Sequence, residues 1–224
     1  MRISIIIPTL NEEAILAETL RAVRAEQPFE IIVVDGGSTD GTRAAAGEAD
    51  LFLAAERGRA RQMNLAARQA RGEVLLFLHA DCTLAPGALR AVERCLRLRS
   101  VSACCFEQCV CDGRWLYRCI NWSASARVRL TGLVYGDQGL CLRRQVFETL
   151  GGFPEVPLLE DLLISRKLRK LGRIIVVPKR ILVSPRRWHR TGIVGQTVRN
   201  WGLTALAAAG VSPERLARLY PVVR

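Results

Sequence analysis

Short apolar runs alternate with amphipathic stretches through the first half of the chain. The apolar runs are rich in β-branched residues or leucine and are followed by turn residues, which is typical of buried parallel strands. We expect these strands at 3–8, 30–35, 50–55 and 73–81. The stretches between them have helical spacing and polar starts, and we expect helices at 11–26, 41–49 and 59–70. Crossovers of this length imply parallel strands with right-handed connections.

The pattern becomes less regular after Pro86. We expect helices at 87–100, 114–130, 158–172 and 192–210. We expect strands at 101–110, 173–178 and 180–184, and a loop followed by a strand at 135–144. No internal repeat or interdomain linker divides the chain, so the sequence predicts a single domain of residues 1–224.

The last expected helix, 192–210, is apolar enough to raise the question of a membrane. Gln196, Arg199 and Asn200 lie near its middle, and a spanning helix wants about 20 apolar residues without charges. The pattern therefore favours a helix that packs on the protein. The alternative is an interfacial helix that places Trp201 and arginines on anionic lipid.

Composition adds a strong positive charge to this picture. The 224 residues are half hydrophobic, which is enough for one sizeable core, and they carry a net charge of +12 that rests almost entirely on arginine. This charge predicts attraction to phosphates, anionic lipid head groups or nucleic acid.

All eight cysteines fall in the middle of the chain, and none form a C-x-x-C pair. The first strand is stopped at Pro8, before the apolar core of a signal peptide can form. We therefore expect a cytoplasmic protein with reduced, mostly buried thiols. A metal or redox site in the segment 104–111 (CCFEQCVC) is the alternative.

Acidic residues end two of the expected strands. Asp35 follows 30–35 and precedes two glycines, and Asp81 ends 73–81. In an open α/β sheet, ligands bind at the carboxyl ends of the strands. Two carboxylates at this edge suit a charged, hydrogen-bonding ligand such as a nucleotide with its metal.

Phosphate and metal ligands can be assigned to the neighbouring loops. Arg57, Arg59 and Arg61 surround Gly58 at the start of a helix, where guanidinium groups and free amides could meet a diphosphate. The carboxylate of Asp81 could bind Mg²⁺ or Mn²⁺ between two phosphates. An imidazole from His79 would favour manganese, although a rim histidine bonded to backbone is the simpler interpretation.

Adjacent carboxylates, Glu160 and Asp161, open the helix expected at 158–172. Consecutive helical residues point about 100° apart, so one acid can face a cleft while the other packs or caps. Asp161 could then act as a general base on an attacking hydroxyl. The alternative is that both are surface acids that complement the helix dipole.

Four motifs, PTLNEE, VVDGGSTDGT, LLFLHAD and LLEDLL, occur in an order and at separations that resemble the family 2 glycosyltransferases of the GT-A fold. The resemblance runs from Ile3 to about Trp188. It implies an α/β, Rossmann-like domain whose mostly parallel sheet is flanked by helices, with further helices at the C-terminus. Residues 1–100 would bind the nucleotide sugar and 101–224 the acceptor. GRARQMN, YGDQG, GGFPEVPLLED and SPRRW are similar, more narrowly, to a branch found beside radical-SAM proteins and labelled for arsenosugar biosynthesis.

The resemblance also implies an inverting transfer with a divalent metal and roles for particular residues. Asp161 would be the base and Asp81 the metal ligand. The donor-binding residues would be Pro8, Thr9, Glu12, Asp35, Ser38, Arg57, Gly58, Arg61, His79, Ala80 and Asp81. The residues near the donor sugar or the acceptor would be Asp137, Gln138, Glu160 and Trp188.

Two positions depart from the family pattern. His79 stands where the first acid of D-x-D is usual, so the metal could be shared with another ligand, for which His189 is a candidate. Arg187 and Trp188 preserve only the last two residues of the usual Q-x-x-R-W signature.

Other functions remain open from the sequence. Nucleotidyl transfer on a similar fold would release pyrophosphate instead of a nucleoside diphosphate. A basic module that binds nucleic acid or an anionic surface is favoured only by the charge, and since no helix-turn-helix, RNA-binding aromatic pair or zinc finger occurs, we expect no nucleic-acid partner. The expected partners are a nucleotide-sugar donor, an unidentified acceptor and, through peripheral contact, the inner face of an anionic membrane.

Overall fold

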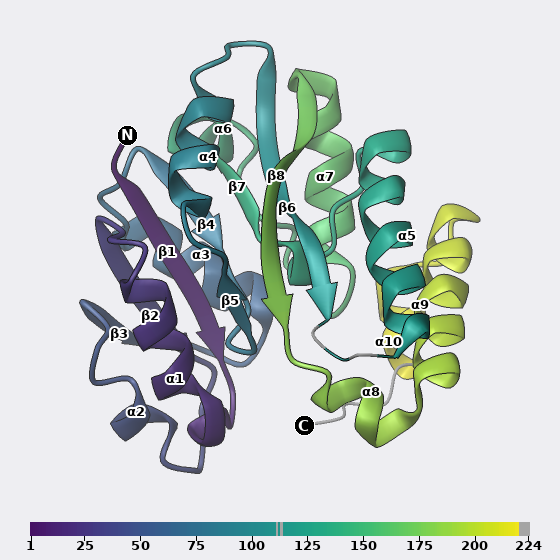
Figure 1. Cartoon of the computed structure of the whole chain (residues 1–224), viewed down its shortest axis with the longest axis horizontal. Helices are drawn as coiled ribbons and strands as arrows, with labels where there is room; N and C mark the ends of the chain where they lie inside the picture. The colour runs from purple at the N-terminus through teal and green to yellow at the C-terminus, as the bar shows by residue number, and fades with distance from the viewer. Residues whose placement is uncertain (111, 113, 220–224) are drawn as a thin grey trace.

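The computed structural model describes residues 1–110, 112 and 114–219, with their side chains except those of 187, 190, 191, 208 and 219. One eight-stranded sheet runs through the molecule, with helices packed against it (Figure 1). Its strands are β1 (Ile3–Thr9), β2 (Glu30–Asp35), β3 (Leu51–Ala54), β4 (Val74–Phe77), β5 (Cys82–Leu84), β6 (Val101–Val110), β7 (Leu140–Arg143) and β8 (Arg173–Val183).

The helices alternate with these strands in the first half of the chain, and the three elements that follow β8 are all helices. They are α1 (Glu13–Arg24), α2 (Thr42–Ala45), α3 (Arg59–Gln69), α4 (Ala88–Leu96), α5 (Trp115–Thr131), the 3-10 helix η1 (Gly136–Gln138), α6 (Arg144–Thr149), α7 (Glu160–Leu171), α8 (Arg186–Thr191), α9 (Ile193–Ala208) and α10 (Pro213–Leu219).

The strand order is β3-β2-β1-β4-β7-β6-β8-β5. Strands β1 to β4 are parallel, as are β6 and β8, whereas β7 runs antiparallel between β4 and β6. The short β5 pairs antiparallel with β8 at the edge. The α/β class with a mostly parallel sheet flanked by helices is therefore confirmed.

Both faces of the sheet are covered, because successive strand residues point to opposite sides. Ile5 and Ile7 pack with residues of α1 and α4 on one side, and Ile6 packs with residues of α3, α6 and α7 on the other. The continuous burial of β1, β2 and β4 is what a parallel sheet covered on both faces requires.

Several elements differ from the sequence expectation, and η1, α6 and α8 were not expected. The strands expected at 173–178 and 180–184 form one strand, β8, because Pro178 falls in a two-residue irregularity between the pairs Val177–Phe106 and Arg180–Glu107. A proline there removes no ladder hydrogen bond. The strand expected at 73–81 ends at Phe77, and the chain turns before forming the unexpected β5.

The cysteines of the described residues are free thiols. Cys104 and Cys141 face each other in the β6–β7 register, and burial raises the pKa of Cys105 to about 12. Such thiols stay protonated and unreactive. Over the described part of the chain, no group of three His, Cys, Asp or Glu residues could hold a metal ion, and Cys111 lies outside the described residues.

Candidate active site

The loop after β2 holds Asp35 in a fixed orientation. The carboxylate, in a residue only 8% exposed, accepts hydrogen bonds from Thr9 Oγ1 (3.1 Å), from Ser38 Oγ (2.5 Å) and from the backbone N–H groups of Gly37 and Ser38. Gly37 has a left-handed φ of 88°, and no atom lies within 4 Å of the place where its Cβ would be. The loop thus combines an oriented acid with open space for a ligand.

The loop after β1 is tied to the same place. Thr39 N donates to Asn11 Oδ1, and Asn11 N donates to Ser38 Oγ, at 2.9 and 2.8 Å. Gln62 of α3 donates from one amide nitrogen to the carbonyls of Thr9 and Val34. The ends of β1 and β2 therefore form one rigid edge, in which Pro8 and Thr9 are buried.

Arg186 joins two acids of the expected diphosphate site. Its guanidinium lies 2.7 Å from Glu12 Oε2 and 3.3 Å from Asp81 Oδ2, and both acidic side chains are less than 10% exposed. Burial lowers the pKa of Arg186, but the contacts with Glu12 and Asp81 outweigh this effect and raise it, so the group stays charged. A cation from α8 thus already contacts Asp81.

A cleft of about 90 Å³ lies at the turn that follows β4. Its walls come from the start of α3, the turn after β4, η1, the start of α7 and one side of α9. They comprise Arg59, His79, Tyr135, Gly136, Asp137, Leu158, Leu159, Asp161, Asn200, Leu203 and Thr204.

Two hydrogen bonds fix the carboxylate of Asp161 in the first turn of α7. Its Oδ2 accepts from the backbone N–H of Gly136 at 2.6 Å, and its Oδ1 accepts from that of Leu162 at 2.8 Å. The preceding Leu159 has a left-handed φ of 67°, which turns the chain into the helix. Glu160 points elsewhere: it is 2% exposed and pairs with Arg59 Nε at 2.8 Å. One acid lines the cleft and its neighbour is packed, as consecutive helical positions require.

His79 and Asp161 approach the same glycine. A Cβ built on Gly136 would stand 2.4 Å from His79 Nε2 and 3.5 Å from Asp161 Oδ2. The turn His79–Ala80–Asp81 therefore links two parts of the site, because His79 lines the cleft while Asp81 contacts Arg186. The second candidate metal ligand, His189, lies instead against Asp112, with 3.1 Å between Nε2 and Oδ2.

The remaining expected residues occupy varied surroundings. Arg57 is exposed, and Arg61 pairs with Glu56 and Glu155. Ala80 is buried at 3%, and Gly58 precedes α3 with a φ of 142°. The ligand roles given to these residues stay predictions.

Three residues expected near the sugar or acceptor already contact other side chains of the protein. Asp137 lines the cleft and accepts from Gln108 at 3.1 Å. Gln138 is fully buried and accepts from Arg127 at 2.5 Å. Trp188 is 6% exposed and packs edge-on against Tyr117, so contact with a sugar would require this ring to become accessible.

Several site residues were not assigned from the sequence. Arg186 lies in the SPRRW segment, but nothing local shows that it contacts acids 105 and 174 residues away. Tyr135 reaches Thr204 of α9 through its hydroxyl. The signal that could have identified α9 is its row of polar residues, Gln196, Asn200 and Thr204, at intervals of four.

Comparisons with known proteins give a consistent result. The family model described as Glycosyl transferase family 2 matches residues 4–144. An undecaprenyl-phosphate 4-deoxy-4-formamido-L-arabinose transferase of Pseudomonas aeruginosa is 32% identical over 158 residues, which are 63% of this chain and 46% of that protein. The chain therefore spans about half the length of this relative.

Solved structures show the same fold. A mannosyltransferase from Pyrobaculum calidifontis, in complex with GDP-Man and Mn²⁺, has a TM-score of 0.66 at 28% identity over 81% of this chain and 56% of its own. Staphylococcus aureus TarS in complex with UDP-GlcNAc has a TM-score of 0.65 at 22% identity, covering 82% of this chain and 58% of its own.

Proposed function

The chain belongs to glycosyl transferase family 2, and on this basis we propose that it is an inverting glycosyltransferase with Asp161 as its general base. It would move a sugar from a nucleoside-diphosphate donor to an acceptor hydroxyl. The observation that carries the proposal is the position of Asp161, which is oriented by two backbone N–H groups and lines a cleft beside the strand ends. A base must be held within hydrogen-bond reach of the proton that it removes.

Single displacement accounts for the arrangement of the residues. Asp161 takes the proton of the acceptor hydroxyl, the oxygen attacks the anomeric carbon, and the nucleoside diphosphate leaves on the opposite side. Asp35, already oriented by Thr9 and Ser38, would accept from the ribose or base of the donor. Arg59 and Arg186, which pair with the buried acids Glu160 and Glu12, would supply positive charge to the diphosphate.

A divalent metal fits this site through Asp81. Magnesium and manganese prefer oxygen ligands, and Mg²⁺ keeps waters and substrate phosphates in most of its positions, so one carboxylate is a sufficient protein contribution. Asp81 would hold the ion, and Arg186, now 3.3 Å away, would have to yield or share that carboxylate. The bound ion would supply positive charge against the departing diphosphate.

We also propose that residues 1–100 bind the donor and that residues 101–224 bind the acceptor. Arg186 belongs to the second half, yet it contacts Glu12 and Asp81 of the first.

We further propose that the enzyme works in the cytoplasm at an anionic membrane surface. The narrower similarity to the radical-SAM-associated branch stays a prediction.

Donor binding and product analysis test the proposal. A thermal-shift panel of nucleoside diphosphates, each with and without Mn²⁺, should show stabilisation by at least one of them that increases with the metal. Turnover of the matching nucleotide sugar should then release free nucleoside diphosphate. Release of pyrophosphate would support nucleotidyl transfer instead, and the absence of any nucleotide effect would contradict both.

A further inference from the structure

Helix α9 has its polar side turned inward. Gln196 is fully buried, and Asn200 and Thr204 line the cleft that holds Asp161. The opposite side carries Val194, Val198 and Trp201, whose exposed fractions are 63%, 60% and 60%. A surface helix of a soluble protein normally has the reverse arrangement.

Helix α5 stands beside α9 at the edge of the molecule far from the N-terminus (Figure 1) and extends the same apolar surface. Trp115 and Trp122 are 69% and 73% exposed. Between the two helices lies an open groove of about 690 Å³. We call this surface the α5–α9 face, and it is formed chiefly by Leu116, Cys119, Trp122, Val194, Val198 and Trp201.

The charges around this face match an anionic surface. Neither α5 nor α9 contains an acidic residue, and Arg118 lines the groove, whereas Arg129 of α5 pairs with Glu107 of β6 at 2.8 Å. The whole chain carries +12. Exposed tryptophans beside a basic residue such as Arg118 are a combination found at the boundary between lipid head groups and acyl chains.

The helices would lie on such a boundary without crossing it. Within the described residues, no helix is long and apolar enough to cross a membrane. The apolar positions of α9 recur at intervals of four and three residues, which gives one stripe along one side. A stripe of this kind buries only the outer side of the helix and leaves the inner side with the protein.

We propose that the α5–α9 face docks on an anionic bilayer and that the acceptor is an amphiphile anchored in the same bilayer. This second part rests on the proposed glycosyl transfer. Trp201 would contact lipid on one side of α9 while Asn200 and Thr204 border the cleft on the other. Because a helix with its side chains is about 10–12 Å across, the polar head of the acceptor has only that distance to cover.

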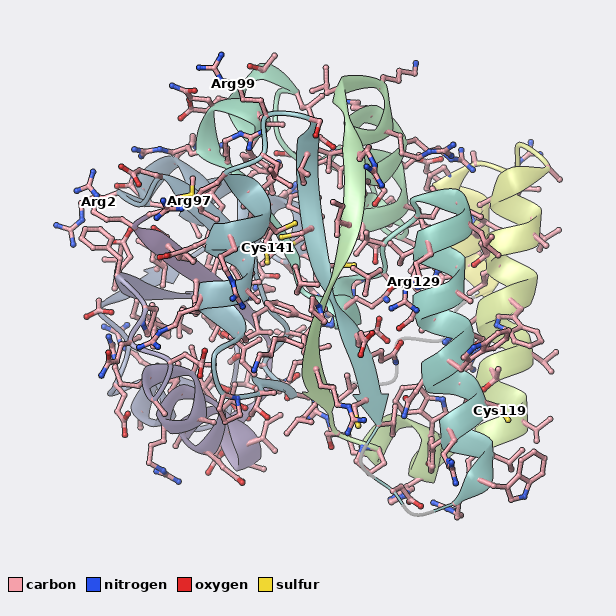
Figure 2. The ribbon with its side chains drawn as sticks, turned by 45° about the horizontal axis from the view of Figure 1, so that its top comes forward. Arg2, Arg97, Arg99, Cys119, Arg129 and Cys141 are labelled. Carbon is pink, nitrogen blue, oxygen red and sulfur yellow. The ribbon has the colours of Figure 1, made fainter. Side chains whose placement is uncertain are left out.

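Co-sedimentation with vesicles tests the docking. The wild-type protein should sediment with vesicles of phosphatidylglycerol and phosphatidylcholine, and less with phosphatidylcholine alone. The double variant Trp122→Ser/Trp201→Ser should lose about tenfold or more in partitioning, because two interfacial anchors are removed. The control is Leu98→Ser, which removes a 56% exposed apolar side chain between Arg97 and Arg99, on the other side of the molecule from Cys119 (Figure 2). It should partition like the wild type.

Two results would overturn the docking: a wild-type protein that stays in the supernatant, or equal binding by all three proteins. Analytical ultracentrifugation supplies a third. A concentration-dependent dimer that the double variant abolishes would assign the face to a second copy of the chain.

Nucleotide binding without vesicles separates this inference from the proposed function. The double variant should keep the wild-type thermal shift with nucleoside diphosphate and Mn²⁺, which shows that it is folded. Vesicle binding without any nucleotide effect would leave the docking intact and refute the enzyme assignment. In the wild type, transfer from the matching nucleotide sugar should be stimulated by membranes isolated from the cells that make the protein. In the double variant this stimulation should be lost. Equal transfer by both proteins would overturn the anchored acceptor.

Discussion

At the scale of single residues, the cleft depends on the absence of a side chain at position 136. The Cβ of an alanine there would stand 2.4 Å from His79 Nε2. We expect Gly136→Ala to cost about 1–3 kcal/mol in unfolding free energy, as overpacking usually does. Urea denaturation measures this cost, and in a His79→Ala background it should largely disappear.

The matched control is Gly195→Ala on α9. No atom lies within 4 Å of the Cβ position at Gly195, so alanine should be neutral or slightly stabilising in the helix. An undiminished cost of Gly136→Ala in the His79→Ala background would show that the imidazole contact is not its cause.

We expect Glu30 to make the free energy of unfolding depend on pH in the acidic range. Burial raises the pKa of its carboxyl, but hydrogen bonds from Ser4 Oγ and from Arg71 outweigh this effect and bring the pKa below the usual 4.5. A depressed pKa contributes stability above the unfolded value, and this contribution is lost as the pH falls through the folded value.

We therefore expect the unfolding free energy to fall below about pH 4.5. Glu30→Gln should cost about 1–3 kcal/mol at neutral pH and flatten this dependence. Urea unfolding at several pH values checks both effects, with Glu18→Gln, an exposed acid, as the control. An unchanged pH dependence in Glu30→Gln would refute the assignment.

Residue-scale prediction from the sequence succeeded where the position depends on a local pattern. Asp35 ends a strand, and Asp161 lies in the first turn of a helix, as expected. Glu160, expected near the donor sugar or the acceptor, is buried and pairs with Arg59. The residues that contact the acidic side chains of the site could not be predicted from a local pattern. Arg186 contacts Asp81 from the start of α8, and only the folded chain brings the two residues together.

At the scale of elements, α3 holds the ends of β1 and β2 together through Gln62. Its amide nitrogen donates to two strand carbonyls, and the residue is 2% exposed. Gln62→Leu removes this donor, so we expect a loss of about 1–3 kcal/mol in chemical denaturation. Gln69→Leu, an exposed position of the same helix, should change stability by no more than about 0.5 kcal/mol. Equal effects of the two variants would contradict the bridging role.

The elements themselves were largely predictable because their periodicity is strong in the first half. The failures have local causes. A proline at 178 suggested two strands, but an irregularity in the pairing with β6 accommodates it. The three residues of β5 are too few to show a pattern, and they form a strand only because β8 passes beside them.

At the scale of the whole molecule, Arg186 of the C-terminal half connects to Glu12 and Asp81 of the N-terminal half. Its guanidinium is the cation that Glu12 and Asp81 share. In Arg186→Met these two largely buried acids lose that charge, so we expect lower stability without metal, by about 1–3 kcal/mol. Added Mn²⁺ should then stabilise the variant more than the wild type, because the ion no longer competes with a guanidinium.

Thermal unfolding with and without MnCl₂ measures this difference. Arg97→Met, which removes an exposed arginine on the surface of the molecule, should respond to Mn²⁺ as the wild type does (Figure 2). The account of Asp81 as the metal ligand fails if Arg186→Met gains nothing from the ion.

The arrangement of the whole molecule was only partly predictable. The alternation of strands and helices indicates a mostly parallel sheet, but the insertion of the antiparallel β7 between β4 and β6 has no signature in the sequence. The inverted polarity of α9 is visible in its residues, yet which side faces the cleft depends on Tyr135 and on the start of α7.

The most direct test of the account compares the wild type with Asp161→Asn, using a nucleotide sugar that the protein binds. We expect the wild type to release nucleoside diphosphate in the presence of acceptor membranes. The variant should bind the donor with similar affinity. It should release nucleoside diphosphate at least about 100-fold more slowly than the wild type, since a general base contributes at least that much. Normal turnover by Asp161→Asn would contradict the central claim.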